Sequence, residues 1–122
     1  MSEPGPRVLL VDDSAELRDV VRSSLEAHGI SVVAQAADGD AAIAAARQSS
    51  PQVVVLDAGI PGASAADVIE QLRALRPAPR VVVYSGWPAA QLAGLGVTVV
   101  AKSAQPMELV QAIRLAVLEP GR

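Results

Sequence analysis

The sequence of 122 residues predicts an α/β fold in which a doubly wound parallel sheet carries helices on both faces. Two observations lead to this prediction. Short aliphatic runs alternate five times with segments whose apolar residues have helical spacing. The runs are also almost continuous in valine, which is typical of strands that are buried on both faces. A single domain is therefore expected over residues 1–122, with a core at about residues 7–118.

The five aliphatic runs are expected to be the strands of this sheet. They are Val8–Val11, Val32–Ala36, Val53–Leu56, Val81–Tyr84 and Val97–Ala101. Strictly alternating strands and helices are joined by right-handed crossovers, so the strands should be parallel. All five should then end at the same edge of the sheet, where ligands bind in folds of this kind.

Capping signals mark the helices between the strands. Asp13 and Glu16 have the spacing of a capping box before the first helix, and Gly29 is expected to end that helix. Asp38 should cap an Ala-rich helix that runs through Arg47. The remaining helices are expected after a capping box at Ser64–Asp67, from Pro88 to about Gly94, and from Pro106 onward.

Composition excludes several classes of function. The net charge is −3 with no basic block, so no nucleic-acid contact through this domain alone is expected. The chain has no cysteine, which excludes thiolate metal sites and thiol nucleophiles. No apolar run approaches the roughly 20 residues of a membrane span, and the N-terminus lacks a signal-peptide core. A cytoplasmic protein without membrane contact is expected.

Polar side chains follow four of the five expected strands. Asp12 and Asp13 follow the first strand, Asp57 the third, Ser85 the fourth and Lys102 the fifth. Taken alone, each has an ordinary structural explanation as a helix cap, a turn residue or a solvated strand end. Taken together, they place three carboxylates, a hydroxyl and an ammonium at one edge of one sheet.

This combination indicates phosphoryl transfer. Three clustered carboxylates repel one another and favour a hard cation, and Mg²⁺ prefers oxygen ligands and phosphate oxygens. A hydroxyl and an ammonium supply hydrogen-bond donors for anionic oxygens. A metal, a carboxylate nucleophile and a lysine are the groups that transfer to an aspartate requires.

The stretches that carry these residues resemble the receiver domain of two-component response regulators. They are "VLLVDD", "VVVLDAGIPG", "VVVYSG" and "VVAKSAQPMELVQAIR", and together they extend over about residues 7–117. The last stretch is most similar to receivers of the subfamily with helix-turn-helix output domains. The resemblance implies a flavodoxin-like (βα)5 sheet with strand order 2-1-3-4-5.

The resemblance also implies a function and a role for each site residue. Asp57 would accept a phosphoryl group from a sensor histidine kinase, while Ser85 and Lys102 would contact that group. The chain would then be a switch whose only catalysis is its own phosphorylation and slow autodephosphorylation, and it would act on a downstream effector or as a homodimer. The Mg²⁺ ligands would be Asp12, Asp13, Asp57 and the backbone carbonyl of Gly59.

The chain departs from the family pattern at a few positions. Val99 stands where the family usually has an aromatic residue that relays phosphorylation, so a degenerate receiver acting as an interaction scaffold is an alternative. An aspartyl phosphatase would commonly carry a second Asp at Gly59, and a flavodoxin would have a Ser/Thr-rich loop after the first strand.

Trp87 corresponds to a position at the rim of the phosphorylation site. Ser103 stands where many relatives have a cis-proline, which leaves the preceding peptide isomer open.

Overall fold

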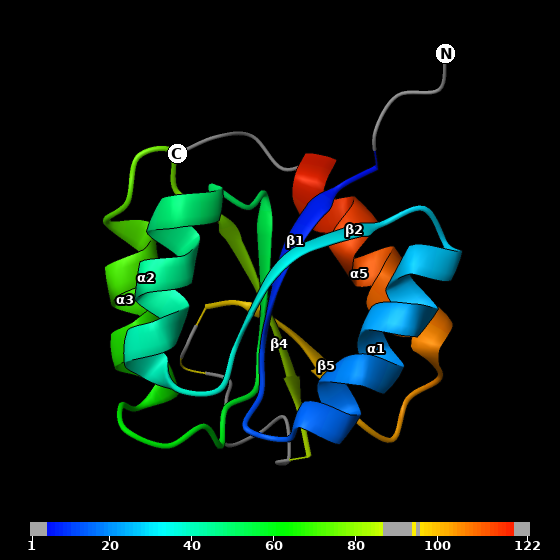
Figure 1. Cartoon of the computed structure of the whole chain (residues 1–122), viewed down its shortest axis with the longest axis horizontal. Coiled ribbons are helices and arrows are strands. Elements are labelled where there is room, and N and C mark those ends of the chain that lie inside the picture. Colours follow the sequence, from blue (N-terminus) through cyan, green and yellow to red (C-terminus); the bar gives the residue numbers. More distant parts are fainter. Residues whose placement is uncertain (1–4, 87–93, 95, 119–122) are drawn as a thin grey trace.

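The computed structural model describes residues 5–86, 94 and 96–118, and these form one sheet of five parallel strands with helices on both faces (Figure 1). The strands lie in the order β2-β1-β3-β4-β5, and all four neighbouring pairs are parallel. Every predicted strand boundary lies within one residue of the observed one. The predicted doubly wound sheet and its strand order are therefore confirmed. The strands are β1 (Arg7–Val11), β2 (Ser31–Ala36), β3 (Val53–Leu56), β4 (Arg80–Ser85) and β5 (Thr98–Ala101).

The described helices cover the two faces of the sheet in pairs. Helices α1 and α5 lie on one face, and α2 and α3 lie on the other (Figure 1). The strand order reverses between β1 and β3, because one strand leads outward to β2 and the other leads toward β4. The carboxyl ends of β1 and β3 are therefore the expected place for a ligand crevice. The helices are α1 (Ala15–Ala27), α2 (Gly39–Ser49), α3 (Ala65–Arg73) and α5 (Pro106–Leu118).

Strand β3 lies between two aliphatic cores, one on each face of the sheet. Val54 and Leu56 pack in the core under α2 and α3, whereas Val53 and Val55 pack in the core under α1 and α5. All four side chains are buried. Burying a side chain of this size stabilises the fold by about 1.5–3 kcal/mol relative to exposing it. The residue that follows this strand, Asp57, is thus attached to the most firmly packed element of the sheet.

The caps of the helices agree with the predictions except at α1. Its N-cap is Ser14, whose Oγ accepts a hydrogen bond of 3.2 Å from the Leu17 N–H. The prediction that Asp13 caps this helix was wrong, because the extended backbone at Ser14 starts the helix one residue later. Asp13 therefore remains outside the helix. Asp38 and Ser64 cap α2 and α3 as predicted.

Trp87 and the predicted short helix from Pro88 to about Gly94, except for Gly94 itself, lie outside the described residues. The Lys102–Ser103 peptide bond, whose isomer the sequence left open, is trans. The one cis peptide bond in the described part of the chain is Arg76–Pro77. No helix within the described ranges combines the length and apolarity needed to cross a bilayer.

Candidate phosphorylation site

The sheet itself brings the two buried aspartates together. Val11 of β1 is in register with Leu56 of β3, so the residues that follow them, Asp12 and Asp57, lie side by side. The backbone ladder continues past both strand ends: the Asp57 N–H donates to the Val11 carbonyl at 2.9 Å, and the Asp12 N–H donates to the Ala36 carbonyl at 3.1 Å. Their positions therefore follow from strand pairing and do not depend on a loop.

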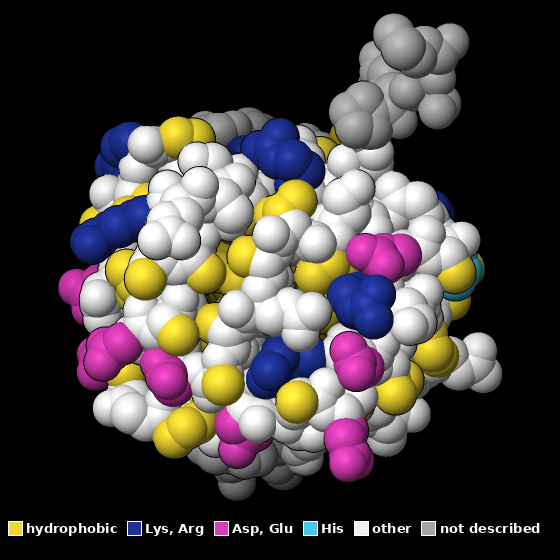
Figure 2. Space-filling model, in the orientation of Figure 1, with side chains coloured by type: hydrophobic (Ala, Val, Ile, Leu, Met, Phe, Trp, Pro, Cys, Tyr) yellow, Lys and Arg dark blue, Asp and Glu magenta, His cyan; other side chains and the backbone are white. Residues whose placement is uncertain are grey.

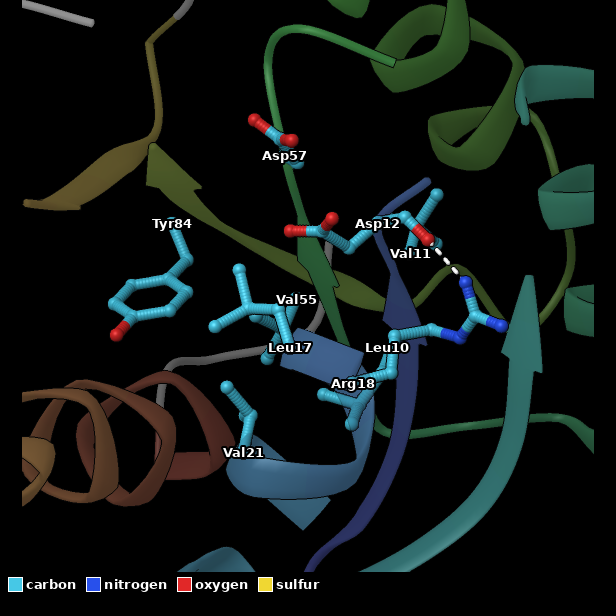
Figure 3. A pocket seen from close by; sticks show the side chains of 9 residues that line it. All are labelled: Leu10, Val11, Asp12, Leu17, Arg18, Val21, Val55, Asp57 and Tyr84. Carbon is cyan, nitrogen blue, oxygen red and sulfur yellow. Dashed lines mark hydrogen bonds between the residues drawn. The ribbon is translucent and has the colours of Figure 1, made fainter. Parts of the chain in front are cut away.

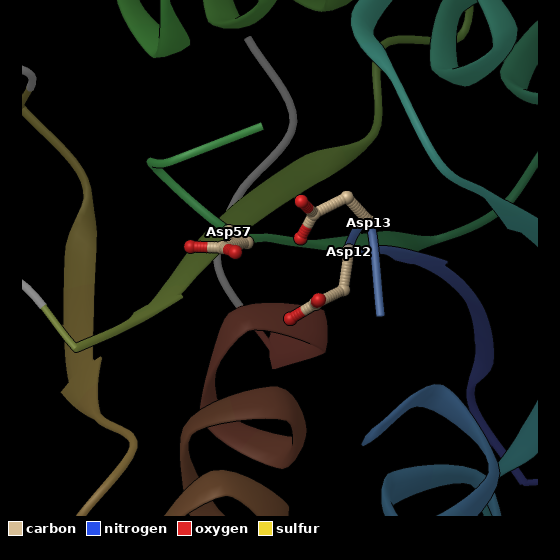
Figure 4. Close-up of side chains that lie close together, drawn as sticks. All are labelled: Asp12, Asp13 and Asp57. Carbon is tan, nitrogen blue, oxygen red and sulfur yellow. The ribbon is translucent and has the colours of Figure 1, made fainter. Parts of the chain in front are cut away.

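Three carboxylates gather at this edge, as the sequence predicted. One oxygen from each of Asp12, Asp13 and Asp57 lies within 4.8 Å of the other two (Figure 4). Asp12 is 7% exposed and Asp57 is 9% exposed, whereas Asp13 is open to solvent. An ion that approached from solvent would therefore meet Asp13 first and would have the two buried carboxylates beneath it.

Lys102 bridges the two buried carboxylates. Its Nζ donates to Asp12 Oδ2 at 2.7 Å and to Asp57 Oδ2 at 3.2 Å. Burial by itself lowers the pKa of this amine, but the hydrogen bonds and charges of the two aspartates outweigh that effect, so the pKa of Lys102 is raised above its usual value. The ammonium therefore stays charged throughout the physiological pH range. One cation faces three carboxylates, which leaves the cluster negative.

The other oxygens of the two buried carboxylates are held by backbone donors. Asp12 Oδ1 accepts from the Ser14 N–H at 2.9 Å, and Asp57 Oδ1 accepts from the Gly59 N–H at 3.1 Å. In both cases the donor is the N–H two residues further along the chain, which is the geometry of an Asx turn. Each carboxylate is thus fixed at one oxygen by backbone and at the other by Lys102.

The remaining predicted residues surround this cluster. Ser85 is fully buried at the end of β4, and its carbonyl accepts a hydrogen bond of 2.9 Å from the Lys102 N–H. Gly59 is exposed on the loop after Asp57. The site therefore collects residues from the ends of four strands that are adjacent in the sheet, β1, β3, β4 and β5, as expected from the positions after each strand.

Sequence reasoning missed Arg18, which lies beside the cluster on α1. Its guanidinium donates through Nη1 to the carbonyl of Asp12 (Figure 3). It also donates through Nε to Oε1 of Gln35 at 3.0 Å, so it ties the end of β1 to β2. A signal was present in the sequence. The helix dipole weakly disfavours a cation near the start of a helix, so Arg18, the fourth residue of α1, is favoured by an acceptor nearby.

The space beneath the carboxylates is small. A cavity of only about 10 Å³ lies there, between the strands and α1, and it is lined by Val21, Val55 and Tyr84 together with Asp12 and Asp57 (Figure 3). Such a volume holds at most about one water molecule. A ligand therefore reaches the two buried carboxylates from the open edge of the sheet.

Known proteins with similar sequences and structures agree with this description. The probable transcriptional regulatory protein TcrX of Mycobacterium tuberculosis is 40% identical over 90 residues, which are 72% of this chain and 38% of TcrX. A LuxR-family two-component response regulator from Aurantimonas has a similar crystal structure, with a TM-score of 0.84 and 32% identity over 93% of this chain and 85% of that one. The signal receiver domain attributed to the response regulator NarL of Mycobacterium tuberculosis has a TM-score of 0.86 and 27% identity over 97% and 100% of the two chains.

These comparisons confirm the resemblance that the sequence motifs suggested. The chain spans less than half of the length of the curated relatives that it matches, between 20% and 42%. The family model of the response regulator receiver domain matches residues 8–114, which is nearly the whole of the described fold. The chain therefore belongs to the response regulator receiver domain family.

Proposed function

We propose that this chain is a phosphoacceptor switch in which Asp57 receives a phosphoryl group from the phosphohistidine of a sensor histidine kinase. The observation that carries this proposal is the bridge from Lys102 to Asp12 and Asp57 inside a cluster of three carboxylates. Membership of the receiver family supports a signalling role in general. The proposal takes residues 1–122 as one receiver domain with its core at 7–118, and not as a turnover enzyme.

We assign Asp57 as the nucleophile because it takes the position of the phosphoacceptor in the receiver family. It follows β3, whose side chains are all buried, and donors on both of its oxygens hold the carboxylate in one orientation. In the proposed step, an oxygen of Asp57 forms a bond to phosphorus while the bond from phosphorus to the imidazole nitrogen breaks. The electron pair returns to that nitrogen, and the product is an acyl phosphate on Asp57.

The donor set at the edge fits Mg²⁺. The three side chains that could bind the ion are all carboxylates, and one of them is exposed. Mg²⁺ typically combines one or two carboxylates with waters and phosphate oxygens. We assign Asp12, Asp13, Asp57 and the Gly59 carbonyl to this ion. When bound, Mg²⁺ would offset the negative charge of the cluster and of the incoming phosphoryl group.

Lys102 and Ser85 would respond to the phosphoryl group. Lys102 remains protonated beside the carboxylates, so it can exchange one of its carboxylate contacts for a phosphoryl oxygen without a change in its charge. Ser85 ends the neighbouring strand, and its hydroxyl would hydrogen-bond another phosphoryl oxygen. This exchange of partners would link phosphorylation to the positions of β4 and β5, and through them to an effector or to a second copy of the chain.

Intact mass spectrometry tests the proposal. The chain is incubated with Mg²⁺ and acetyl phosphate, and the wild type should gain the mass of one phosphoryl group. Asp57→Asn should gain none, and omission of Mg²⁺ should abolish the gain in the wild type. Labelling of Asp57→Asn to the level of the wild type would overturn the assignment of the nucleophile.

One observation supports a second candidate function. The described strand β5, Thr98–Ala101, contains no aromatic residue, and Val99 takes the place of the aromatic relay. A receiver without that relay would work as an interaction scaffold whose partner contacts do not depend on phosphorylation. Labelling at Asp57 without any change in oligomeric state or in kinase binding would favour the scaffold over the switch.

A further inference from the structure

A large hollow of the described surface lies at the edge of the sheet opposite to the carboxylates. It has a volume of about 450 Å³ and is formed where α3 ends and where β4 and β5 begin. Pockets that bind small molecules usually have volumes of about 300–1,000 Å³. Because the phosphorylation site uses the carboxyl ends of the strands, this hollow at their amino ends takes no part in it.

Three arginines line this hollow, namely Arg73, Arg76 and Arg80, and none of its described lining residues is acidic. Arg73 and Arg76 are exposed, and neither forms an ion pair with a carboxylate of residues 5–86, 94 or 96–118. Figure 2 shows basic side chains at the upper left of the visible face and others at its centre and right, while most acidic side chains lie in the lower half. A chain with a net charge of −3 thus keeps a basic recess.

Backbone carbonyls hold the two exposed guanidinium groups in place. Arg73 Nη2 donates to the Gly96 carbonyl at 3.1 Å, and Arg76 Nη1 donates to the carbonyls of Arg73 and Leu75, each at 2.8 Å. These contacts fix the side chains without neutralising their charge. Each guanidinium has five N–H donors in a planar fork, so most of its donors remain available to an anion.

The ordinary explanation for basic residues at this end of the fold is the helix dipole, which favours cations in the last turn of a helix. It accounts for Arg73, which lies in the last turn of α3. It also favours Arg76, which lies beyond the helix but donates to the carbonyl of Arg73, the last residue of α3. It does not account for Arg80, which begins β4. It also does not explain why the three residues surround a recess.

Apart from Gly96 and Thr98, the rest of the described lining is aliphatic. Val81 and Val97 are half-buried, and Ala116 is buried. A recess with guanidinium groups and an aliphatic wall fits a ligand with an anionic group attached to an apolar body. A phosphate group suits the two guanidinium groups better than a carboxylate, because its additional oxygens and charge allow both forks to bind at once.

We propose that this recess binds a small organic phosphate of nucleotide size, with its phosphate on Arg73 and Arg76 and its apolar body against Val81, Val97 and Ala116. This site is separate from the phosphorylation of Asp57 and goes beyond the proposed switch. Its ligand would bind without Mg²⁺, because no described carboxylate lines the recess.

Titration with ADP in the presence of EDTA tests the site. Backbone amide NMR shifts of the wild type should change at Val81, Val97 and Thr98 and saturate in the micromolar to low millimolar range. Pyrophosphate, which has no apolar body, should bind several-fold more weakly. Arg73→Gln and Arg76→Gln should each weaken ADP binding by about 10-fold, because each removes a charged hydrogen-bonding partner.

Two matched variants serve as controls. Arg22→Gln removes an arginine of α1 that pairs with Asp19 and Glu26, and Asp57→Asn alters the other edge of the sheet. Neither should change the affinity for ADP. Arg76→Lys keeps the charge without the fork and should lose most of the affinity. Absence of saturable shifts, shifts confined to the Asp57 edge, or an equal loss in Arg22→Gln would overturn the proposal.

Discussion

Asp12 and Asp57 are held in the same way, although 45 residues separate them in the chain. Each accepts an N–H from the residue two positions further along at Oδ1, and each accepts from Lys102 at Oδ2. Asp13 has no hydrogen bond or ion pair of this kind among the described contacts, and it is exposed. The three carboxylates of the site are therefore not equivalent.

This difference leads to a prediction for the metal-free protein. Asp13→Asn removes a repelling charge without removing a Lys102 contact, so it should raise the melting temperature in EDTA by about 1–4 °C. Asp12→Asn relieves the same repulsion but weakens an ion pair with Lys102, so it should give a smaller increase or a decrease. Thermal unfolding in EDTA measures both variants, and a larger gain for Asp12→Asn would contradict this ranking.

Mg²⁺ binding should depend sharply on Asp13. Asp13→Ala removes the carboxylate that is most open to an arriving ion, and we expect its Mg²⁺ affinity to fall by about 10-fold or more. Asp19→Ala, which removes an exposed acid of α1, is the matched control and should bind Mg²⁺ as the wild type does. Isothermal titration calorimetry distinguishes the two, and equal affinities would remove Asp13 from the ligand set.

The alternating pattern of the sequence was sufficient to predict the strands and the polar residues at their ends. The valine-rich runs of the central strands reflect burial on both faces, whereas the edge strands β2 and β5 are partly exposed and were predicted from their aliphatic residues alone. A parallel sheet brings all strand ends to one edge. The cap of α1 could not be predicted in the same way. Asp13 and Ser14 are both good N-caps, and only the backbone conformation selects Ser14.

The contacts within the site were also beyond sequence reasoning. The sequence indicated that Lys102 and the aspartates share an edge, but the two-way bridge from Lys102 depends on the length and packing of its side chain. The contacts of Arg18 depend on how α1 crosses the ends of β1 and β2. Such details are set by tertiary packing, which local propensity does not encode.

The cap of α1 gives a prediction about stability. Ser14→Ala removes the hydroxyl that accepts the Leu17 N–H and should destabilise the fold by about 1 kcal/mol. Ser64→Ala at α3, whose hydroxyl accepts the Asp67 N–H, should have a similar cost. Urea denaturation measures both changes, and an unaffected midpoint for Ser14→Ala would indicate that α1 begins elsewhere in solution.

Arg18 should matter for metal binding although it is not a ligand. It fixes the main chain at Asp12, so Arg18→Gln should allow the adjacent carboxylates to move and weaken Mg²⁺ binding by about 10-fold, as loss of a supporting contact typically does. Arg22→Gln, one turn further along α1, is the control for loss of a positive charge near the helix. A gain in Mg²⁺ affinity in Arg18→Gln would mean that the charge of Arg18 repels the ion more than its hydrogen bonds help.

Lys102→Arg tests whether the compact ammonium is required. A guanidinium is wider and planar, and it cannot approach Asp12 at 2.7 Å and Asp57 at 3.2 Å as a single point charge. The variant should fold, because it keeps the positive charge among the carboxylates, but it should be labelled by acetyl phosphate at most about one tenth as fast as the wild type. Circular dichroism establishes the fold, and intact mass measured over time gives the rate. Labelling at the rate of the wild type would show that any cation at this position is sufficient, and that the bridge seen between Asp12 and Asp57 serves stability and not phosphoryl transfer.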